Sequence, residues 1–291
     1  MHDNNPYLLN KTHVRRAFER AAASYAQSSI VQREISHRLL ERLDLIRLQP
    51  ATLLELGSAT GDTTSGLFKK YPKAHLIALD SSPAMLAHTR ARKPWLRKLS
   101  PVCADAEQLP LADASCDMII SNLTLHWCND LQQVFAECWR VLRPQGLLLF
   151  SSYGPDTLLE LRQSWAAVDD QIHVHAFMDM HDIGDALIRT QFADPVMDAE
   201  RLTVTYPDPR ALLQDLRRLG AVNASVGRLR GLTGKHKFQA MLNTYEHYRQ
   251  EGLIPATLEV VYGHAWKPEA IRARRLDDGT AVFPVAQLTR R

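Results

Sequence analysis

The sequence predicts an α/β fold in which a mostly parallel central sheet carries helices on both faces. Short, nearly continuous apolar runs alternate with helical patterns through the first half of the chain, at the spacing of βαβ units. The run at 52–56 is almost wholly apolar and stops at Gly57, as is typical of a strand buried on both faces. Hydrophobic residues make up 45% of the 291 positions, which is enough to bury the core that such a fold requires.

The elements of the first half follow from periodicity and from turn residues. Apolar residues recur at three- and four-residue steps over 11–45 and predict helical structure there. Ser82 and Pro83 open a helix after the second strand, as an N-cap and a first-turn proline. The expected strands span 52–56, 74–79, 101–104, 116–121 and 147–152, and the helices between them include 63–70 and 131–142.

The second half is mostly helical. The sequence predicts a helix at 156–168, a strand at 202–206, amphipathic helices at 209–219 and 235–250, and a long strand at 256–266. About fifty residues therefore separate the last two strands, which predicts a lid or substrate-recognition insertion at about 207–252. The expected organisation is a helical cap at 1–48, one α/β domain at 49–268 and a basic tail at 269–291.

Composition and charge argue against several classes of protein. The formal net charge of +3 does not indicate a nucleic-acid binder, and no apolar stretch approaches the roughly 18 residues of a membrane span. The polar N-terminus lacks the apolar region of a secretory signal, so we expect a cytoplasmic location. We also expect the protein to be a monomer. The four cysteines form no CxxC pair and are expected to be small buried groups; they are Cys103, Cys116, Cys128 and Cys138.

A group of histidines and aspartates invites a metal-site interpretation. It consists of His173, His175, Asp179, His181 and Asp182. The spacing of these residues matches no standard ligand motif, so we expect no metal.

The most informative segment is the glycine-containing turn that follows the first strand. Gly57 permits a tight turn and Gly61 a close approach of the backbone to a ligand. Asp80 ends the next strand, where a carboxylate can accept both hydroxyls of a ribose. A dinucleotide site would need a third glycine at the position of Ala59, where bare backbone faces a pyrophosphate. The turn therefore favours a nucleoside without a pyrophosphate over NAD.

These segments resemble the motifs of class I S-adenosylmethionine-dependent methyltransferases, whose fold is Rossmann-like. The first motif is similar to "LELGSATGDTT", the second to "ALDSSPAML", the third and fourth to "ADAEQLPLADASCDMIISNLTLHW", and the fifth to "RVLRPQGLLLFSSYGPDTLLEL". Further segments resemble the malonyl-acyl-carrier-protein O-methyltransferase family of biotin synthesis: "AFERAAASYAQSSIVQ", "SNLTLHW", "LRRLGAVNASVGRLRGLTG" and "ATLEVVYGHAW". The resemblance covers nearly the whole chain. The chain departs from the usual motifs at Ser58-Ala59 and at Gln145.

The resemblance implies a set of site residues. The cofactor-binding residues would be Glu55, Gly57, Ser58, Gly61, Asp80, Ser81, Met85, Asp105, Ala106, Glu107 and Asn122. Among them, Glu55, Gly57 and Gly61 would hold the methionine part, Asp80 the ribose, and 105–107 would flank the adenine. The catalytic residues would be Tyr25, His126 and Asn122. Simple helix packing is the alternative for Tyr25, and a structural hydrogen bond is the alternative for His126.

The implied reaction is methyl transfer from S-adenosylmethionine to the free carboxylate of a malonyl thioester on acyl-carrier protein or coenzyme A. That carboxylate is already ionised at neutral pH, so catalysis would depend on positioning and on removal of water, without a general base. A cation or several hydrogen-bond donors would orient it. The sequence does not show which of the candidate cations faces inward; they are Arg217, Arg218, Arg228, Arg230 and Lys235. Together these residues also form a basic stretch suited to an acidic carrier protein, or simply a solvated face.

Three alternatives stay open at this point. One is a methyltransferase of the same fold that acts on another small molecule, such as a quinone precursor or a sterol-like substrate. Another is a relative that keeps the fold but acts as an assembly or hydroxylating factor on a respiratory-complex protein. The third is an NAD-dependent enzyme, against which Ala59 argues.

Overall fold

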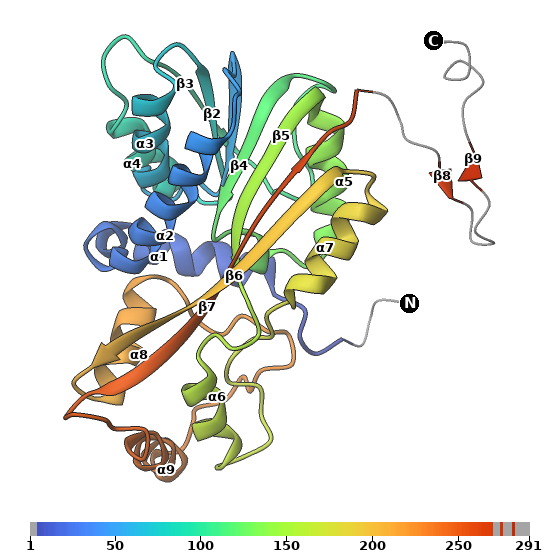
Figure 1. Ribbon diagram of the computed structural model, residues 1–291. Helices are drawn as coiled ribbons and strands as arrows, with labels where there is room; N and C mark the ends of the chain where they lie inside the picture. The colour runs from blue at the N-terminus through green and yellow to red at the C-terminus, as the bar shows by residue number, and fades with distance from the viewer. Residues whose placement is uncertain (1–4, 270–273, 276–280, 283–291) are drawn as a thin grey trace.

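The computed structural model describes residues 5–269, 274–275 and 281–282. Its centre is a seven-stranded sheet with the strand order β3-β2-β1-β4-β5-β7-β6 (Figure 1). The strands are β1 Thr52–Leu56, β2 His75–Asp80, β3 Lys98–Cys103, β4 Cys116–Asn122, β5 Leu142–Tyr153, β6 Ala193–Tyr206 and β7 Ile254–Trp266. The first five pair in parallel, whereas β7 is antiparallel to both β5 and β6. The predicted α/β fold with a mostly parallel sheet is confirmed.

Helices surround this sheet. They are α1 Lys11–Ser28, α2 Ile30–Glu41, α3 Asp62–Lys70, α4 Pro83–Ala91, α5 Leu131–Val141, α6 Leu159–Ala166, α7 Met180–Arg189, α8 Pro209–Arg218 and α9 Lys235–Glu246, with short 3₁₀ turns η1 Arg42–Leu45 and η2 Leu125–Trp127. The predicted start of α4 is confirmed. Ser82 is the N-cap, and its hydroxyl accepts the Met85 N–H, while Pro83 is the first residue of the helix.

Successive residues of the central strands enter different cores, because side chains alternate across a sheet. Leu53 packs with α2 and α3 on one face, in a cluster with Leu39 and Leu67. Leu54 points to the opposite face and packs in a cluster with Phe135 of α5 and Leu187 of α7. This explains why the strands read as continuous apolar runs, and it confirms that helices cover both faces of the sheet.

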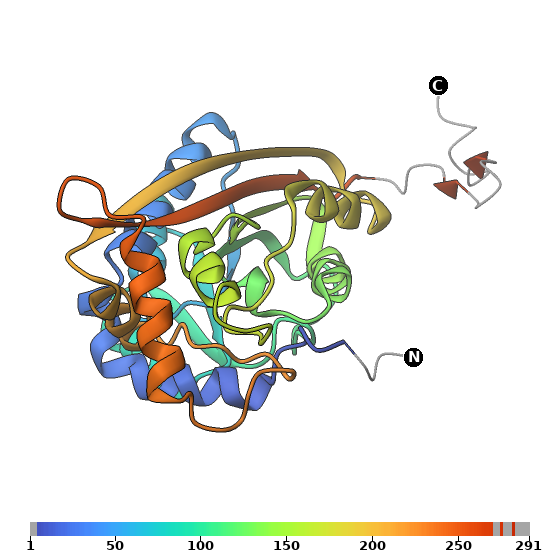
Figure 2. The same cartoon turned by 90° about the horizontal axis from the view of Figure 1, so that it is seen from below.

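A third core lies beyond the parallel part of the sheet. There α6, α8 and α9 pack against the far ends of β6 and β7, around buried residues such as Trp165, Leu212, Tyr245 and Ile254. Figure 2 shows these helices from below, on one side of the long β6–β7 pair. The helices α8 and α9 occupy the stretch between β6 and β7, where the sequence predicts an insertion. The tail expected at 269–291 lies outside the described residues, apart from Glu269 and the short antiparallel pair β8 Arg274–Arg275 and β9 Ala281–Val282.

Several element boundaries differ from the sequence prediction. The strand expected at 202–206 begins nine residues earlier, at Ala193, and the helix α7 is absent from the prediction. The early part of β6 holds a proline and several acidic residues, which have low strand propensity. It is extended because it pairs with β7 and because Asp198 and Glu200 form ion pairs with Arg42 and Arg38. Long-range contacts of this kind leave no local signal.

Among the described helices, none combines the length and the apolar character that crossing a bilayer requires.

The turn before the core of β5 holds a residue in a strained backbone conformation. Gln145 has φ +64° in the left-handed region, and its N–H donates to the Lys267 carbonyl oxygen at 2.8 Å. A side chain in this region costs roughly 1–2 kcal/mol, whereas glycine adopts it freely. We predict that Gln145→Gly raises the free energy of unfolding by about 0.5–1 kcal/mol, after the larger entropy of the unfolded glycine chain is subtracted. Urea denaturation measures it.

The matched control is Gln145→Ala, which removes the side chain beyond Cβ but keeps the strain. An equal gain in stability from the alanine and glycine variants would contradict a backbone origin.

Candidate functional site

The turn between β1 and α3 is shaped by the close approach of Thr124. Gly57 has φ +73°, and a Cβ built there would lie 1.9 Å from the Thr124 Oγ1 atom. The Gly57 and Ser58 N–H groups both donate to the Leu79 carbonyl oxygen, at 2.8 and 3.0 Å. The turn is therefore pinned to the end of β2, and it leaves no room for a side chain at its first position.

Asp80 holds the same turn from the end of β2. Its Oδ2 accepts the Ala59 N–H at 2.9 Å, and its Oδ1 accepts the Ser82 N–H at 2.8 Å. Burial raises the pKa of Asp80 to about 6, while the hydrogen bonds from the backbone act in the opposite direction. A carboxylate has about four lone-pair sites, so Asp80 keeps acceptor capacity for a ligand beside these backbone donors.

The turn borders a crevice of about 360 Å³ at the carboxyl ends of the parallel strands. That volume is within the roughly 300–1,000 Å³ of small-molecule sites. The structure brings ten of the residues expected at the site together in its wall: Tyr25, Gly57, Ser58, Asp80, Ser81, Met85, Asp105, Ala106, Asn122 and His126. Three others, Glu55, Gly61 and Glu107, are not part of the wall.

Glu55 is buried beneath the turn. Its side chain is only 1% exposed, and its Oε2 accepts a hydrogen bond from the Thr64 hydroxyl at 2.5 Å. Burial raises the pKa of Glu55 to about 8, against the smaller opposing effect of the Thr64 hydrogen bond. Gly61 is the N-cap of α3, with φ +83°. Both residues shape the turn from behind.

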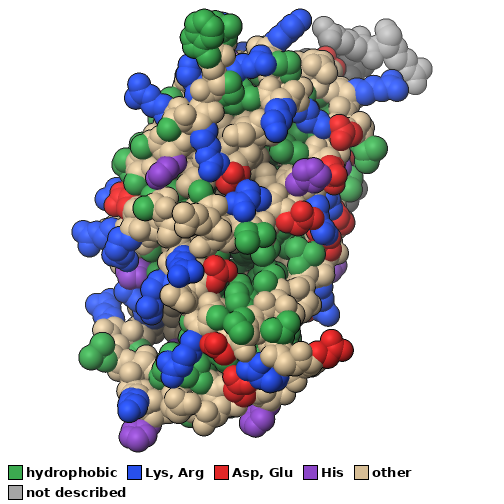
Figure 3. All heavy atoms as spheres, turned by 90° about the vertical axis from the view of Figure 1, so that its left-hand side faces the viewer, with side chains coloured by type: hydrophobic (Ala, Val, Ile, Leu, Met, Phe, Trp, Pro, Cys, Tyr) green, Lys and Arg blue, Asp and Glu red, His purple; other side chains and the backbone are tan. Residues whose placement is uncertain are grey.

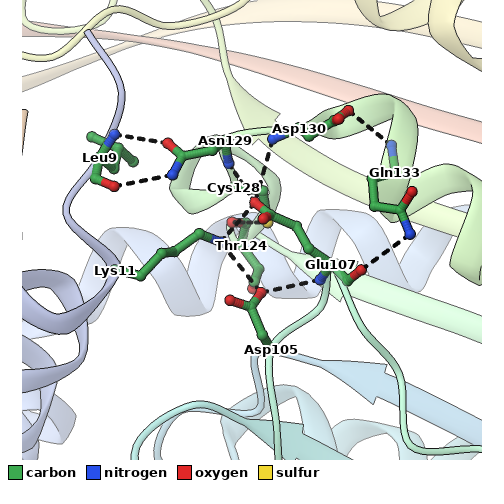
Figure 4. A network of polar contacts seen from close by, with 9 residues as sticks. All are labelled: Leu9, Lys11, Asp105, Glu107, Thr124, Cys128, Asn129, Asp130 and Gln133. Carbon is green, nitrogen blue, oxygen red and sulfur yellow. Dashed lines mark hydrogen bonds and ion pairs between the residues drawn. The ribbon is translucent and has the colours of Figure 1, made fainter. Parts of the chain in front are cut away.

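Figure 4 shows a polar network at one end of the crevice, where Lys11 lies between two carboxylates. The Lys11 Nζ is 3.2 Å from Asp105 Oδ1 and 2.7 Å from Glu107 Oε1. Glu107 Oε1 also accepts the Asn129 N–H at 2.5 Å. Glu107 is therefore turned toward Lys11 and Asn129, whereas Asp105 lies on the crevice wall with one oxygen outside this network.

The segment before α1 is tied to the same network. The Asn129 side chain accepts the Leu9 N–H at 2.7 Å and donates to the Leu9 carbonyl oxygen at 3.0 Å. On its other side, the Asn10 N–H donates to Ala224 O and the Val226 N–H donates to Leu8 O. The N-terminal segment thus joins the α/β domain to the insertion beside the crevice. Sequence analysis missed Lys11 and Asn129, because their partners are about a hundred residues away in the chain.

Another part of the crevice wall consists of polar groups that are neutral at neutral pH. Burial raises the pKa of both the Tyr25 and Tyr153 hydroxyls, and burial lowers the pKa of His126 well below its usual value. Gln32 Oε1 and His126 Nδ1 are buried and have no hydrogen-bond partner among the described residues. Buried polar atoms usually find a partner, so these two atoms indicate where a ligand contributes polar groups.

Asn122 lies between these groups and the sheet. Its Nδ2 donates to the Gln32 carbonyl oxygen at 3.2 Å, and its Oδ1 accepts the Ser151 hydroxyl at 2.8 Å. The amide therefore joins β4 to α2 and β5. Both ends of the Asn122 amide are therefore hydrogen-bonded within the chain, at the crevice wall.

The three histidines of the metal hypothesis go to separate places. His173 stacks on Trp165 with ring centroids 3.6 Å apart, and His181 is exposed beside Asp179. His175 lies behind His126, 6.4 Å between nearly parallel rings, and burial lowers its pKa to about 4. Within the described ranges, no group of three or more histidine, cysteine, aspartate or glutamate side chains has the geometry of a metal site.

The cations expected to orient a carboxylate lie outside the crevice. Arg217, Arg218, Arg230 and Lys235 are exposed, and none of them contributes to the wall. Arg228 is half-buried and also lies away from it. The cations of the wall are instead Lys11, Arg15 and Arg33.

Comparison with known proteins finds one matching family and several similar proteins. The family described as "Methyltransferase domain" matches residues 54–150. The malonyl-[acyl-carrier protein] O-methyltransferase of Gallionella capsiferriformans is 51% identical over 96% of this chain and 97% of its own length. The protein of the same name from Laribacter hongkongensis is 48% identical over 95% and 96%. The YcgJ protein of Bacillus subtilis covers 80% of this chain and all of its own with a TM-score of 0.58, but at 15% identity it supports the fold alone.

The raised pKa of Glu55 makes a prediction about stability. A carboxyl that titrates near 4.5 when unfolded and near 8 when folded stabilises the protein fully below pH 4.5, and this contribution is lost as the pH rises toward 8. We predict that Glu55→Gln, an uncharged isostere, reduces the fall in the free energy of unfolding between pH 5 and pH 8. At pH 8 the variant is more stable than the wild type by roughly 1 kcal/mol or more. Urea denaturation of the ligand-free protein at several pH values measures this.

The control is Glu251→Gln, which changes an exposed carboxyl and is expected to leave the profile unchanged. Parallel pH profiles for the wild type and Glu55→Gln would contradict the raised pKa.

Proposed function

Since the chain belongs to the malonyl-[acyl-carrier protein] O-methyltransferase family, we propose that its crevice holds S-adenosylmethionine and that it methylates the free carboxyl of a malonyl thioester on acyl-carrier protein. The observation that carries this proposal is the 51% identity over nearly the full length of a relative with that name, because it includes the insertion as well as the cofactor motifs. The sequence resemblance implies that the reaction belongs to biotin synthesis.

The residues of the crevice fit such a cofactor. The backbone of the turn from Gly57 to Gly61 would hold the methionine part, and the remaining acceptor capacity of Asp80 would take the ribose hydroxyls. The free oxygen of Asp105, beside Ala106, would accept from the adenine amine. The turn suits a nucleoside without phosphates, because Ala59 places a side chain where a pyrophosphate needs bare backbone.

The chemistry requires little from acids and bases. When bound, the cofactor supplies an electrophilic methyl group on a sulfonium, so that an attacking carboxylate oxygen forms a C–O bond as the C–S bond breaks. A carboxyl with an ordinary pKa near 4 is already ionised, and no proton has to move. The residues of this chain therefore contribute by orienting the nucleophile and by excluding water.

Neutral donors are well suited to that task. The Tyr25 hydroxyl and the His126 imidazole lie in the crevice wall, and both are uncharged at neutral pH for the reasons given above. They would hold a carboxylate by hydrogen bonds without the stronger ground-state stabilisation of an ion pair. Aromatic rings surround His126, with Tyr153 at 4.9 Å and Trp127 at 5.3 Å between centroids, and they would keep water away.

The alternatives of the sequence analysis find less support. The name shared by the relatives favours a carboxyl methyltransferase over an enzyme for quinone or sterol-like substrates. It also favours catalysis over a role as an assembly factor.

Methyl transfer tests the function directly. We predict that the purified chain transfers labelled methyl from S-adenosylmethionine to malonyl-acyl-carrier protein but not to acetyl-acyl-carrier protein, which lacks a free carboxyl. Scintillation counting of the precipitated carrier protein measures the product. Equal labelling of both carriers, or of neither, would overturn the proposal.

The ribose role of Asp80 is open to calorimetry. We predict that Asp80→Ala weakens S-adenosylmethionine binding by about 1–3 kcal/mol, because the ribose hydroxyls lose a buried acceptor. Asp80→Asn keeps the size of the side chain and one of its two acceptor oxygens, and it is expected to bind with intermediate affinity. Unchanged affinity in Asp80→Ala would remove Asp80 from the cofactor site.

A further inference from the structure

Six arginines without acidic partners gather on one side of the molecule. We call this set the arginine face; it consists of Arg16, Arg20, Arg217, Arg218, Arg228 and Arg230. Five are exposed and Arg228 is half-buried. In the part of the chain that the structure describes, none of the six forms an ion pair with a carboxylate. Other exposed arginines of the molecule do form such pairs, including Arg92 with Asp62 and Arg201 with Asp156.

The arginine face is brought together by the packing of α8 on α1. The Ser24 hydroxyl donates to the Arg218 carbonyl oxygen at 3.0 Å, and a Cβ at Gly220 would lie 3.2 Å from the Ala21 Cβ. Arg16 and Arg20 are four residues apart on α1 and therefore project from one side of that helix, while Ala17 and Ala21 are buried.

The loop after α8 adds the remaining arginines. The Asn10 N–H donates to the Ala224 carbonyl oxygen at 2.9 Å, which places this loop beside the start of α1. Burial lowers the pKa of His13, and the charges of Arg228, Arg20 and Arg16 lower it further, so these three guanidinium groups lie near one imidazole. In Figure 1, α1 and α8 lie on the left, and Figure 3 shows abundant lysine and arginine side chains on that side.

The arginine face borders the crevice. The helix α1 also contributes Lys11, Arg15 and Phe18 to the crevice wall, and the residues after α8 contribute Leu219 and Ala221. A protein docked on the arginine face would therefore hold a substrate arm next to the crevice.

Exposed apolar side chains lie among these charges. Val226, Leu229 and Leu232 are 44%, 45% and 99% exposed, and they alternate along the loop with Arg228 and Arg230. Protein interfaces commonly combine apolar contacts with a charged rim. Leu232 makes almost no contact within this chain, so an internal packing role does not account for it.

We propose that the arginine face is the docking surface for an acidic face of the acyl-carrier protein, with the loop at 226–232 supplying apolar contacts. This inference rests on the proposed function, which identifies the carrier of the substrate. Uncompensated like charges repel one another, and an acidic partner relieves that repulsion while it steers association. Two features of the arginine face favour a protein as the partner. Apolar side chains are interspersed among its charges, and the crevice lies at its border.

The test is the charge reversal Arg16→Glu/Arg20→Glu. With malonyl-acyl-carrier protein as substrate, kcat/KM is expected to fall by about 10- to 100-fold, mostly through KM, and to lose most of its dependence on salt. With malonyl-pantetheine, which has the thioester but no protein, kcat/KM is expected to stay within about twofold of the wild type, and the affinity for S-adenosylmethionine to stay unchanged. An unchanged rate with the carrier protein would overturn the proposal, and so would equal losses with both substrates.

The matched control is Arg47→Glu/Lys73→Glu, which reverses two exposed cations that precede β1 and β2, at the end of the sheet opposite the crevice. It is expected to keep wild-type rates with both substrates. If this control loses as much activity with the carrier protein as the arginine-face variant does, net charge alone accounts for the effect. That result would overturn the proposal of a localised docking surface.

A second variant, Leu232→Ser, tests the apolar part without a change of charge. Because Leu232 is 99% exposed, the substitution is expected to leave the melting temperature unchanged and to raise KM for the carrier protein by about three- to tenfold. An unchanged KM would remove the loop from the docking surface. A wild-type chain that methylates neither malonyl substrate would instead overturn the proposed function, which separates that failure from a misplaced docking surface.

Discussion

The site depends on one steric and electrostatic constraint, the turn after β1. Thr124 closes one side of it so tightly that only glycine fits at position 57, and Asp80 ties it to β2 through the Ala59 N–H. Glu55 supports the turn from beneath, through Thr64 of the following helix. The crevice is the space that remains in front of this turn, and its position at the carboxyl ends of parallel strands follows from the topology.

This dependence explains which features are predictable from the sequence. Gly57 and Asp80 follow strands that are buried on both faces, so an apolar run and the residue that ends it predict both the strand and the site. The beginning of β6 is not predictable in this way, because it depends on pairing with β7. The helix α7 is missed although it has local signals, an Asp179 N-cap and buried Ile183, Ala186 and Leu187 at helical spacing. Lys11 and Asn129 are missed for a reason related to that of β6, since their partners are distant in the chain.

The N-terminal segment shows how distant parts of the chain build one site. Lys11 binds the carboxylates that follow β3, and Leu9 pairs with Asn129 beside η2. The same segment pairs with the loop after α8 through Asn10 and Val226. Each link is a hydrogen bond or an ion pair of modest strength, but together they fix α1 over the crevice. The position of Tyr25, near the end of that helix, thus depends on contacts made at its beginning.

Charge is distributed differently inside and outside the crevice. Within it, Lys11 is paired with Asp105 and Glu107, and burial keeps His126 neutral. The other two cations of the wall are also held within the chain, since Arg15 pairs with Glu19 and Arg33 donates to the Ala26 carbonyl oxygen. Outside it, the arginine face has no acidic partner within the described chain. A cation held against a reacting carboxylate would lower the energy of the ground state and make the oxygen a weaker nucleophile. A cation on the surface has no such effect on the reaction, and it still attracts an acidic partner. The arrangement therefore separates recognition of the partner from the chemistry of the carboxylate.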